Sequence, residues 1–164
     1  ALHYIVGHKN RTDVHFGLVG GGTELTSLQA YAKALGIEDY VTFTGRVSDQ
    51  QMLEMLNTAD VCVNPDVANE MNDKSTMNKI MEYMALAKPI VQFDLSEGRF
   101  SAQEASLYAR RNDTKDLAEK ILLLLDDQVK RKAMGDFGRN RIITELEWKY
   151  EEPKLLEAYR LLFL

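Results

Sequence analysis

The sequence predicts an α/β fold in which an open parallel sheet is flanked by helices, as in a Rossmann-like domain. β-rich apolar runs alternate with helical patterns along most of the chain. The run 61–63 is apolar without interruption, which is typical of a parallel strand covered on both faces. Strands that alternate with helices form right-handed βαβ units, so we expect the strands to be parallel.

The first part of the chain is expected to begin in a helix, because residues 1–10 read as a helix already under way, with no capping residue ahead of it. That start indicates an earlier segment in a longer parent protein. A strand at 14–19 then breaks at three consecutive glycines, and a helix with one apolar face runs from Leu25 to Leu35. Gly36 ends this helix where a left-handed residue is needed, and a strand follows at 41–44.

The middle of the chain carries clear start and stop signals for helices. Ser48 and Gln51 have the spacing of a capping box, which predicts a helix toward Ala59 and then a strand at 60–64. Ser75 or Thr76 is expected to cap the next helix, which must end before the Lys-Pro pair at 88–89. The remaining predicted elements are strands at 89–93 and 105–108 and helices at 114–126, 128–146 and 151–163.

Composition limits the possible functions. A chain of 164 residues that is 45% hydrophobic suits one domain, 1–164, and its net charge of −5 argues against a nucleic-acid surface. The lone Cys62 allows no intrachain disulfide, which favours the cytoplasm. The longest apolar stretch, 121–125, is far shorter than the roughly 20 residues of a membrane span. Peripheral association of the parent with the inner face of the membrane stays open.

Ligands of open parallel sheets bind outside the carboxyl ends of the strands, so the loops 20–23, 45–48, 64–76 and 94–101 are the candidate site. The sequence Lys74-Ser75-Thr76 lacks the upstream glycines of a P-loop, but a helix N-terminus near Thr76 suits an anionic diphosphate.

Lys79 and Glu82 lie three residues apart, near one face of that helix and near its ligand end. A cation beside phosphates and a carboxylate that accepts from ribose hydroxyls would together hold a nucleoside diphosphate. An ordinary surface ion pair is the alternative that the spacing leaves open. The histidines have no spacing that suits a metal, and no metal or other cofactor is expected.

The block Met77–Val91 resembles the donor-site signature of the group 1, or family 4, retaining glycosyltransferases. Further blocks agree with that family in the same order along the chain, namely His15–Glu24, Val41–Val47, Ala59–Pro65 and Leu124–Asp127. The resemblance therefore covers essentially the whole chain.

The resemblance implies one half of a GT-B fold: the C-terminal domain that binds a nucleoside-diphosphate sugar without a metal, with the acceptor-binding N-terminal domain absent. The parent would be a hexosyltransferase acting in surface polysaccharide or glycan synthesis. Glu82 matches the acid that binds the donor ribose, and Lys79 matches a basic residue three before it in some subfamilies. The other donor-binding residues that it suggests are Arg46, Val47, Asp73, Ser75, Thr76, Met77 and Asn78.

Two departures from the family pattern limit what the resemblance carries over. The family often has a second Glu where this chain has Lys74, beside Asp73, and its Gly-Arg…Lys-Gly loop would precede Ala1. The isolated chain is therefore expected to be inactive, and no catalytic residue is assigned. A non-catalytic Rossmann-like binding or interaction module remains the alternative. The sugar, the base and the acceptor stay open.

Overall fold

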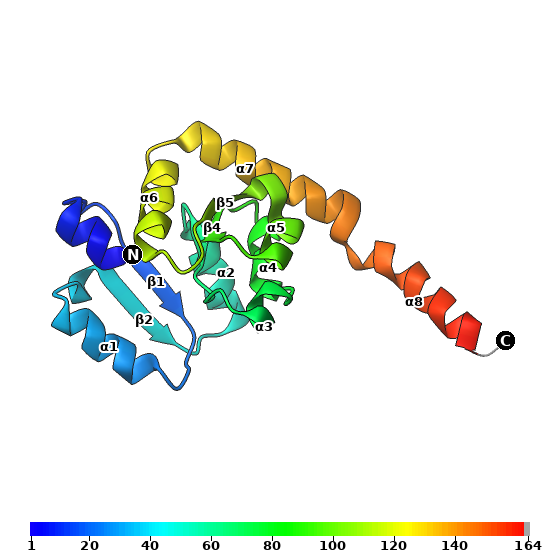
Figure 1. The fold of residues 1–164 in the computed structure, drawn as a ribbon, viewed down its shortest axis with the longest axis horizontal. Coiled ribbons are helices and arrows are strands. Elements are labelled where there is room, and N and C mark those ends of the chain that lie inside the picture. Colours follow the sequence, from blue (N-terminus) through cyan, green and yellow to red (C-terminus); the bar gives the residue numbers. More distant parts are fainter. Residues whose placement is uncertain (163–164) are drawn as a thin grey trace.

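The computed structural model describes residues 1–162 and shows an α/β protein in which every paired strand is parallel (Figure 1). The strands form a two-stranded and a three-stranded sheet, ordered β1-β2 and β3-β4-β5. Their bounds are β1 Phe16–Val19, β2 Val41–Gly45, β3 Cys62–Asn64, β4 Ile90–Phe93 and β5 Ser106–Ala109. The predicted fold class is confirmed, but the single open sheet is divided in two.

Helices connect the strands and flank the sheets. In the first half of the chain they are η1 Tyr4–His8, α1 Leu25–Ala34, η2 Glu38–Tyr40, α2 Asp49–Thr58, α3 Glu70–Asp73 and α4 Asn78–Ala85. In the second half they are α5 Ser96–Ala102, η3 Gln103–Ala105, α6 Thr114–Leu125, α7 Gln128–Arg141, η4 Ile142–Leu146 and α8 Trp148–Leu162. Among residues 1–162, no helix has the length and apolar character needed to cross a membrane.

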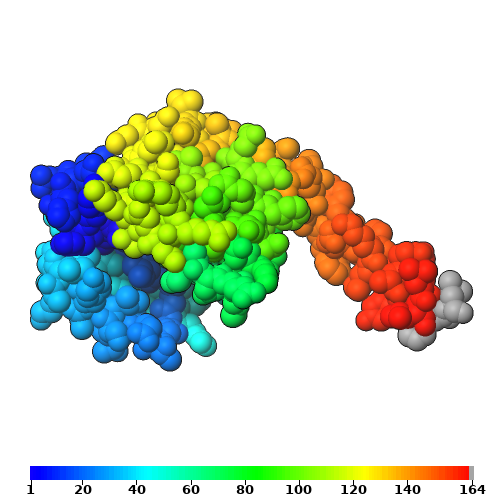
Figure 2. Space-filling view, viewed as in Figure 1, coloured from blue at the N-terminus to red at the C-terminus, as the bar shows by residue number. Residues whose placement is uncertain are grey.

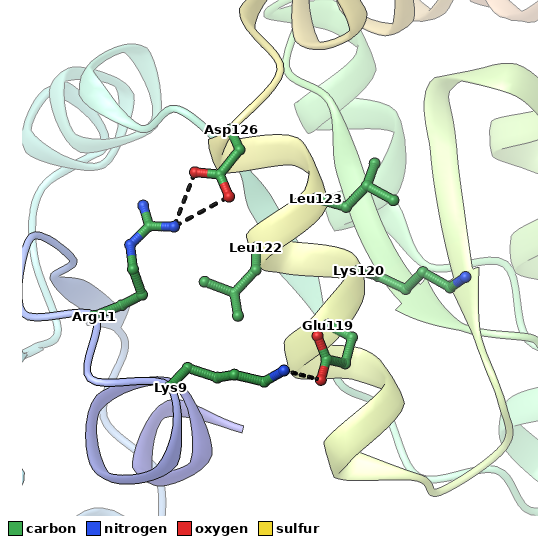
Figure 3. Close-up of a pocket in the computed structure, with 7 residues that line it drawn as sticks. All are labelled: Lys9, Arg11, Glu119, Lys120, Leu122, Leu123 and Asp126. Carbon is green, nitrogen blue, oxygen red and sulfur yellow. Dashed lines mark hydrogen bonds and ion pairs between the residues drawn. The ribbon is translucent and has the colours of Figure 1, made fainter.

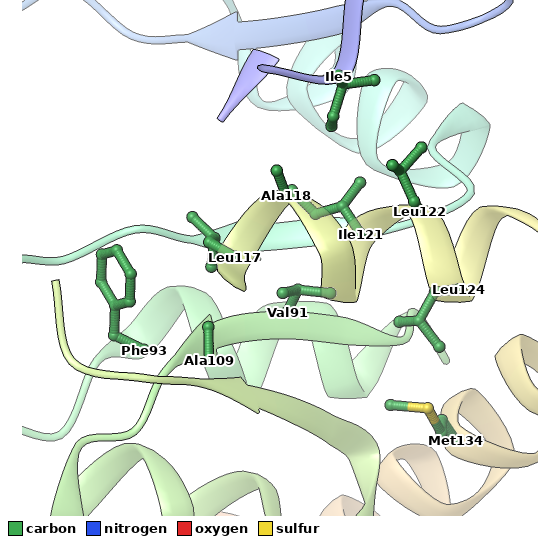
Figure 4. Packing of buried hydrophobic residues seen from close by; sticks show 10 residues of the cluster. All are labelled: Ile5, Val91, Phe93, Ala109, Leu117, Ala118, Ile121, Leu122, Leu124 and Met134. Atoms are coloured by element: carbon green, nitrogen blue, oxygen red, sulfur yellow. The ribbon is translucent and has the colours of Figure 1, made fainter. Parts of the chain in front are cut away.

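The larger sheet is packed on both faces. All four residues of β4 are buried, and successive side chains point to opposite faces. Val91 and Phe93 pack under α6 with Ile121 and Leu124 (Figure 4). Ile90 packs on the other face with residues of α4 and α5. The strand predicted to be covered on both faces, at 61–63, is the neighbouring β3, in which Cys62 is buried and Val63 half-buried.

The smaller sheet is less completely covered, because β1 alternates between half-buried and exposed residues. A separate cluster of Leu2, Ala32 and Ile37 packs beneath it. Phe16 of β1 and Val63 of β3 also both contact the cluster under α6. Within residues 1–162 the two sheets therefore share a hydrophobic layer but no strand ladder.

Two backbone details anchor α7 to this body. Ala87, just after α4, has φ = 54°, a left-handed conformation that costs a residue with a Cβ. Gly135 of α7 lies so close that a Cβ there would collide with the Ala87 carbonyl. After α7, η4 still packs against the core through Ile142 and Leu146. The chain then leaves the body, and α8 projects away from it with exposed apolar side chains (Figures 1 and 2).

Local signals predicted some helix ends and missed others. The Ser48–Gln51 capping box is present, and Gly36 has φ = 65° as expected. The predicted cap of α4 is wrong: the helix begins at Asn78 with Met77 as N-cap, and no side chain caps it. The predicted last helix is present as α8, although Phe163 lies outside the described residues.

Candidate functional site

The candidate site lies at the carboxyl ends of the strands, where the loops after β1, β2, β3 and β4 reach the same edge of the fold. The segment after β3 carries the short helix α3 and then α4, and the loop after β4 leads into α5. Contacts between α3 and α5 and between α4 and α5 join the loops after β3 and β4 into one surface.

Lys79 extends from the first turn of α4 and pairs with an acid that sequence reasoning did not single out. Its Nζ donates to Asp66 Oδ1 at 2.9 Å, and Asp66 follows the end of β3. The two side chains are 37% and 24% exposed, so the ion pair is partly desolvated. Lys79 is thus a fixed positive charge at the carboxyl edge of the sheet, and the predicted partner Glu82 does not pair with it.

Glu82 lies one turn further along α4 and is exposed. Within residues 1–162 its carboxylate takes part in no hydrogen bond or ion pair. The carboxylate therefore has its full capacity to accept hydrogen bonds from a ligand.

Asp73 is bound to the protein itself. Its Oδ1 accepts from the backbone N–H of Ser96 at 2.9 Å and from Arg111 at 2.8 Å, and its Oδ2 accepts from the Ser96 hydroxyl at 3.0 Å. The Ser96 N–H, followed by the Ser96 hydroxyl and the charge of Arg111, holds the pKa of Asp73 below its usual range. Asp73 thereby ties α3 to the start of α5, and a contact with a donor sugar stays a prediction.

The hydroxyls expected to cap α4 have other partners. Ser75 Oγ donates to the Met71 carbonyl at 2.6 Å, and Thr76 Oγ1 donates to Glu97 Oε2 at 3.0 Å. These bonds hold the turn that leads into α4. Of the next two residues, Asn78 is exposed and Met77 packs against the core.

Arg46 and Val47 follow β2 and lie beside the glycine-rich loop after β1. A Cβ on Gly21 would lie 3.5 Å from the Arg46 backbone nitrogen, so the two loops are in contact. A hollow of about 410 Å³ opens beside them at the carboxyl ends of β1 and β2. It is lined by Leu18, Val19, Gly20, Gly21, Gly22, Glu24, Leu25, Leu28 and Phe43.

Sequence reasoning missed two residues for different reasons. Asp66 lies in the loop 64–76, one of the loops at the carboxyl ends of the strands where ligands were expected to bind. Its position in the sequence could therefore have identified it as a candidate. Arg111 comes from the segment between β5 and α6, and it reaches Asp73 only because the fold brings residues 38 apart together. No pattern of neighbouring residues in the sequence predicts the contact between Arg111 and Asp73.

A second hollow, of about 460 Å³, lies between η1 and α6 (Figure 3). Ion pairs flank it: Lys9 with Glu119 at 2.7 Å and Arg11 with Asp126 at 2.8 Å. Asp126 follows the C-terminus of α6, and Arg11 precedes β1. The hollow is therefore near the amino ends of the strands, away from the candidate site.

Comparisons with known proteins agree with this architecture. A solved glycosyltransferase from Rickettsia africae superposes with a TM-score of 0.83 at 15% identity, over 99% of this chain and 43% of that one. The Anabaena protein HepE, solved with UDP and glucose, gives a TM-score of 0.82 at 17% identity, over 97% of this chain and 44% of that one. At such identities the likeness shows the fold.

Sequence comparison identifies the family. The chain is 27% identical over 144 residues to a GDP-mannose-dependent monoacylated alpha-(1-6)-phosphatidylinositol monomannoside mannosyltransferase of Corynebacterium glutamicum, covering 86% of this chain and 37% of that protein. The chain thus spans little more than a third of the length of such relatives. Residues 1–127 match the family model for glycosyl transferases group 1, so the chain belongs to the group 1 glycosyltransferases.

Proposed function

We propose that this chain is the donor-binding half of a retaining glycosyltransferase and binds a nucleoside-diphosphate sugar at the carboxyl ends of its strands. The observation that supports it most directly is the pair of side chains on α4: the fixed cation Lys79 and, one turn on, the unengaged carboxylate of Glu82. Both belong to the block that resembles the family's donor signature. The parent protein would transfer a hexose to an acceptor hydroxyl in glycan synthesis.

Each group has a role that follows from its chemistry. The Glu82 carboxylate accepts hydrogen bonds from the ribose hydroxyls, and the Lys79 ammonium offsets the charge of the diphosphate. The glycine-rich loop lines the hollow beside β2, and the Arg46 backbone lies against Gly21 of that loop, with Val47 next along the chain. The base would bind in this hollow. In the transfer step the diphosphate leaves with growing negative charge, so fixed cations near it lower the barrier.

The parent would also need parts that residues 1–162 do not supply. An N-terminal acceptor domain is expected to face the carboxyl edge, and no metal is expected to take part. Cytoplasmic location, with peripheral association at the inner face of the membrane, is part of the same proposal. A non-catalytic binding module is less favoured, because the family match covers most of the chain.

Calorimetric titration with GDP and UDP tests the binding site. Glu82→Gln should weaken binding of the preferred diphosphate about tenfold or more, a loss of roughly 1–3 kcal/mol, because an amide accepts weaker hydrogen bonds than a carboxylate. Lys79→Ala should weaken binding of the diphosphate more than binding of the bare nucleoside, and the difference should shrink as salt rises.

Lys132→Ala is the matched control, because Lys132 is an exposed lysine of α7 that pairs with Asp136 one turn away. It should leave both affinities unchanged. If neither diphosphate binds, or if Lys79→Ala lowers diphosphate and nucleoside affinity equally, the proposed site is wrong.

A further inference from the structure

The segment between β3 and α4, residues 65–76, lies at the carboxyl edge of the larger sheet, and every one of its residues is half-buried or exposed. We call this segment the strap. Its helix α3 has only four residues. Val67 and Met71 are 59% and 77% exposed, so the larger apolar side chains of the strap do not anchor it in the core. Polar contacts must therefore hold the strap on the body.

Asn112, in the turn between β5 and α6, clamps the first part of the strap. Its Oδ1 accepts from the Ala68 N–H at 2.7 Å, and its Nδ2 donates to the Ala68 carbonyl at 3.1 Å. The amide thus satisfies both backbone groups of one residue, as a paired strand would. Asn112 has φ = 59°, a left-handed conformation that asparagine adopts more readily than most residues with a Cβ. Both the side chain and the backbone preference of asparagine therefore suit this position.

The other end of the strap is held from two sides. Asp73 accepts from Arg111 at 2.8 Å and from the Ser96 backbone N–H at 2.9 Å. Thr76 donates to Glu97 at 3.0 Å. The turn after β5 therefore holds both parts of the strap, through two consecutive residues.

The strap carries a charge of the proposed donor site. Asp66, its second residue, forms the ion pair with Lys79. Because a lysine ammonium carries several N–H donors, Lys79 can keep this pair while it contacts a phosphate. A lysine stem is flexible, and a side chain that is already ordered loses less entropy when it binds a ligand. The position of the strap therefore determines how well Lys79 is ordered for a diphosphate.

We propose that Asn112 is a positioning residue for donor binding. By clamping Ala68 it keeps the strap against the body, with Asp66 in the place where it orders Lys79. The role rests on the proposed function of Lys79, and Asn112 acts through the strap without a contact to the ligand. Release of the strap lowers the fraction of molecules that are ready to bind, and the apparent affinity falls with that fraction.

Asn112→Gly tests the clamp, because glycine removes the amide and still adopts a left-handed φ freely. In the ligand-free chain, amide hydrogen exchange should become about threefold faster or more at Ala68 and across the strap, with β4 unchanged. In calorimetric titration, the preferred diphosphate should bind about three- to tenfold more weakly.

Asn10→Gly is the matched control, since it makes the same substitution in the same backbone conformation. Asn10 is exposed, has φ = 53° and lies between η1 and β1, near the amino ends of the strands. This variant should change neither exchange in the strap nor the affinity for the diphosphate.

The Lys79→Ala background distinguishes positioning from a general loosening of the fold. There Asn112→Gly should no longer weaken diphosphate binding, because no ammonium remains to be ordered. If the Lys79→Ala chain binds too weakly to titrate, the bare nucleoside serves instead, and Asn112→Gly should leave its affinity unchanged. An equal loss of affinity in both backgrounds, or for diphosphate and nucleoside alike, would overturn the proposal.

The remaining outcomes separate this role from the proposed function. A wild-type chain that binds neither GDP nor UDP overturns the donor site and the role of Asn112 with it. A wild-type chain that binds a diphosphate no more tightly than Asn112→Gly overturns the positioning role alone. Unchanged exchange at Ala68 in Asn112→Gly would show that the strap stays in place without the clamp, and it would overturn the positioning role as well.

Discussion

The two sheets are built from the same kind of parallel strand, yet they differ in how far they are buried. β4 is buried along its whole length between α6 on one face and α4 with α5 on the other. β1 is half exposed at alternate residues. The larger sheet therefore holds most of the burial that stabilises the fold, while the smaller sheet contributes the loops that border the hollow beside β2.

The largest difference between the regions should come from truncating a leucine in each. Leu124 is fully buried and Leu28 is 43% exposed. Leu124→Ala should lower the free energy of unfolding by about 3–4 kcal/mol, and Leu28→Ala by less than about 1 kcal/mol. Urea denaturation measures both, and equal losses would show that the two sheets are equally well packed.

Glycine substitutions give a smaller contrast. Gly135→Ala should cost about 2–3 kcal/mol in the free energy of unfolding, because the new methyl group would collide with the Ala87 carbonyl and push α7 from the body. Gly22→Ala in the loop after β1 meets no atom within 4 Å and should be nearly neutral. A neutral Gly135→Ala would mean that α7 shifts without cost.

The smallest expected effect comes from replacing an alanine by glycine. The change in the free energy of unfolding should have opposite signs at the two positions compared. Ala87→Gly relieves a left-handed alanine and should raise the free energy of unfolding by about 0.5 kcal/mol. Ala30→Gly, on the exposed face of α1, should lower it by about 1 kcal/mol. Thermal unfolding of both variants checks the pair, and a destabilised Ala87→Gly would mean that the methyl group of Ala87 packs favourably.

Features set by neighbouring residues were predictable from the sequence. The Ser48–Gln51 capping box and the left-handed Gly36 depend on residues within one turn, and both are present. The apolar run 61–63 likewise indicated a strand covered on both faces, and in β3 Cys62 is buried and Val63 half-buried. The family block placed Lys79 and Glu82 on α4 near its start, as the structure has them.

Features set by distant residues were not predictable. Thr76 was expected to cap α4, but Glu97 of α5 takes its hydroxyl. Asp73 looked free to contact a ligand until the fold brought Ser96 and Arg111 to it. The division into two sheets could not be predicted from the sequence either. The order of strands in a sheet depends on which strands meet in space and not on their spacing along the chain.

The sole cysteine gives the protein a practical property. Cys62 is buried in β3, and burial raises the pKa of its thiol to about 12. At pH 8 the Cys62 thiol is therefore protonated and unreactive. A cysteine introduced at an exposed position such as Arg46 would therefore be alkylated almost exclusively. A fluorophore attached there could report nucleotide entry by its emission, with the native thiol left in place.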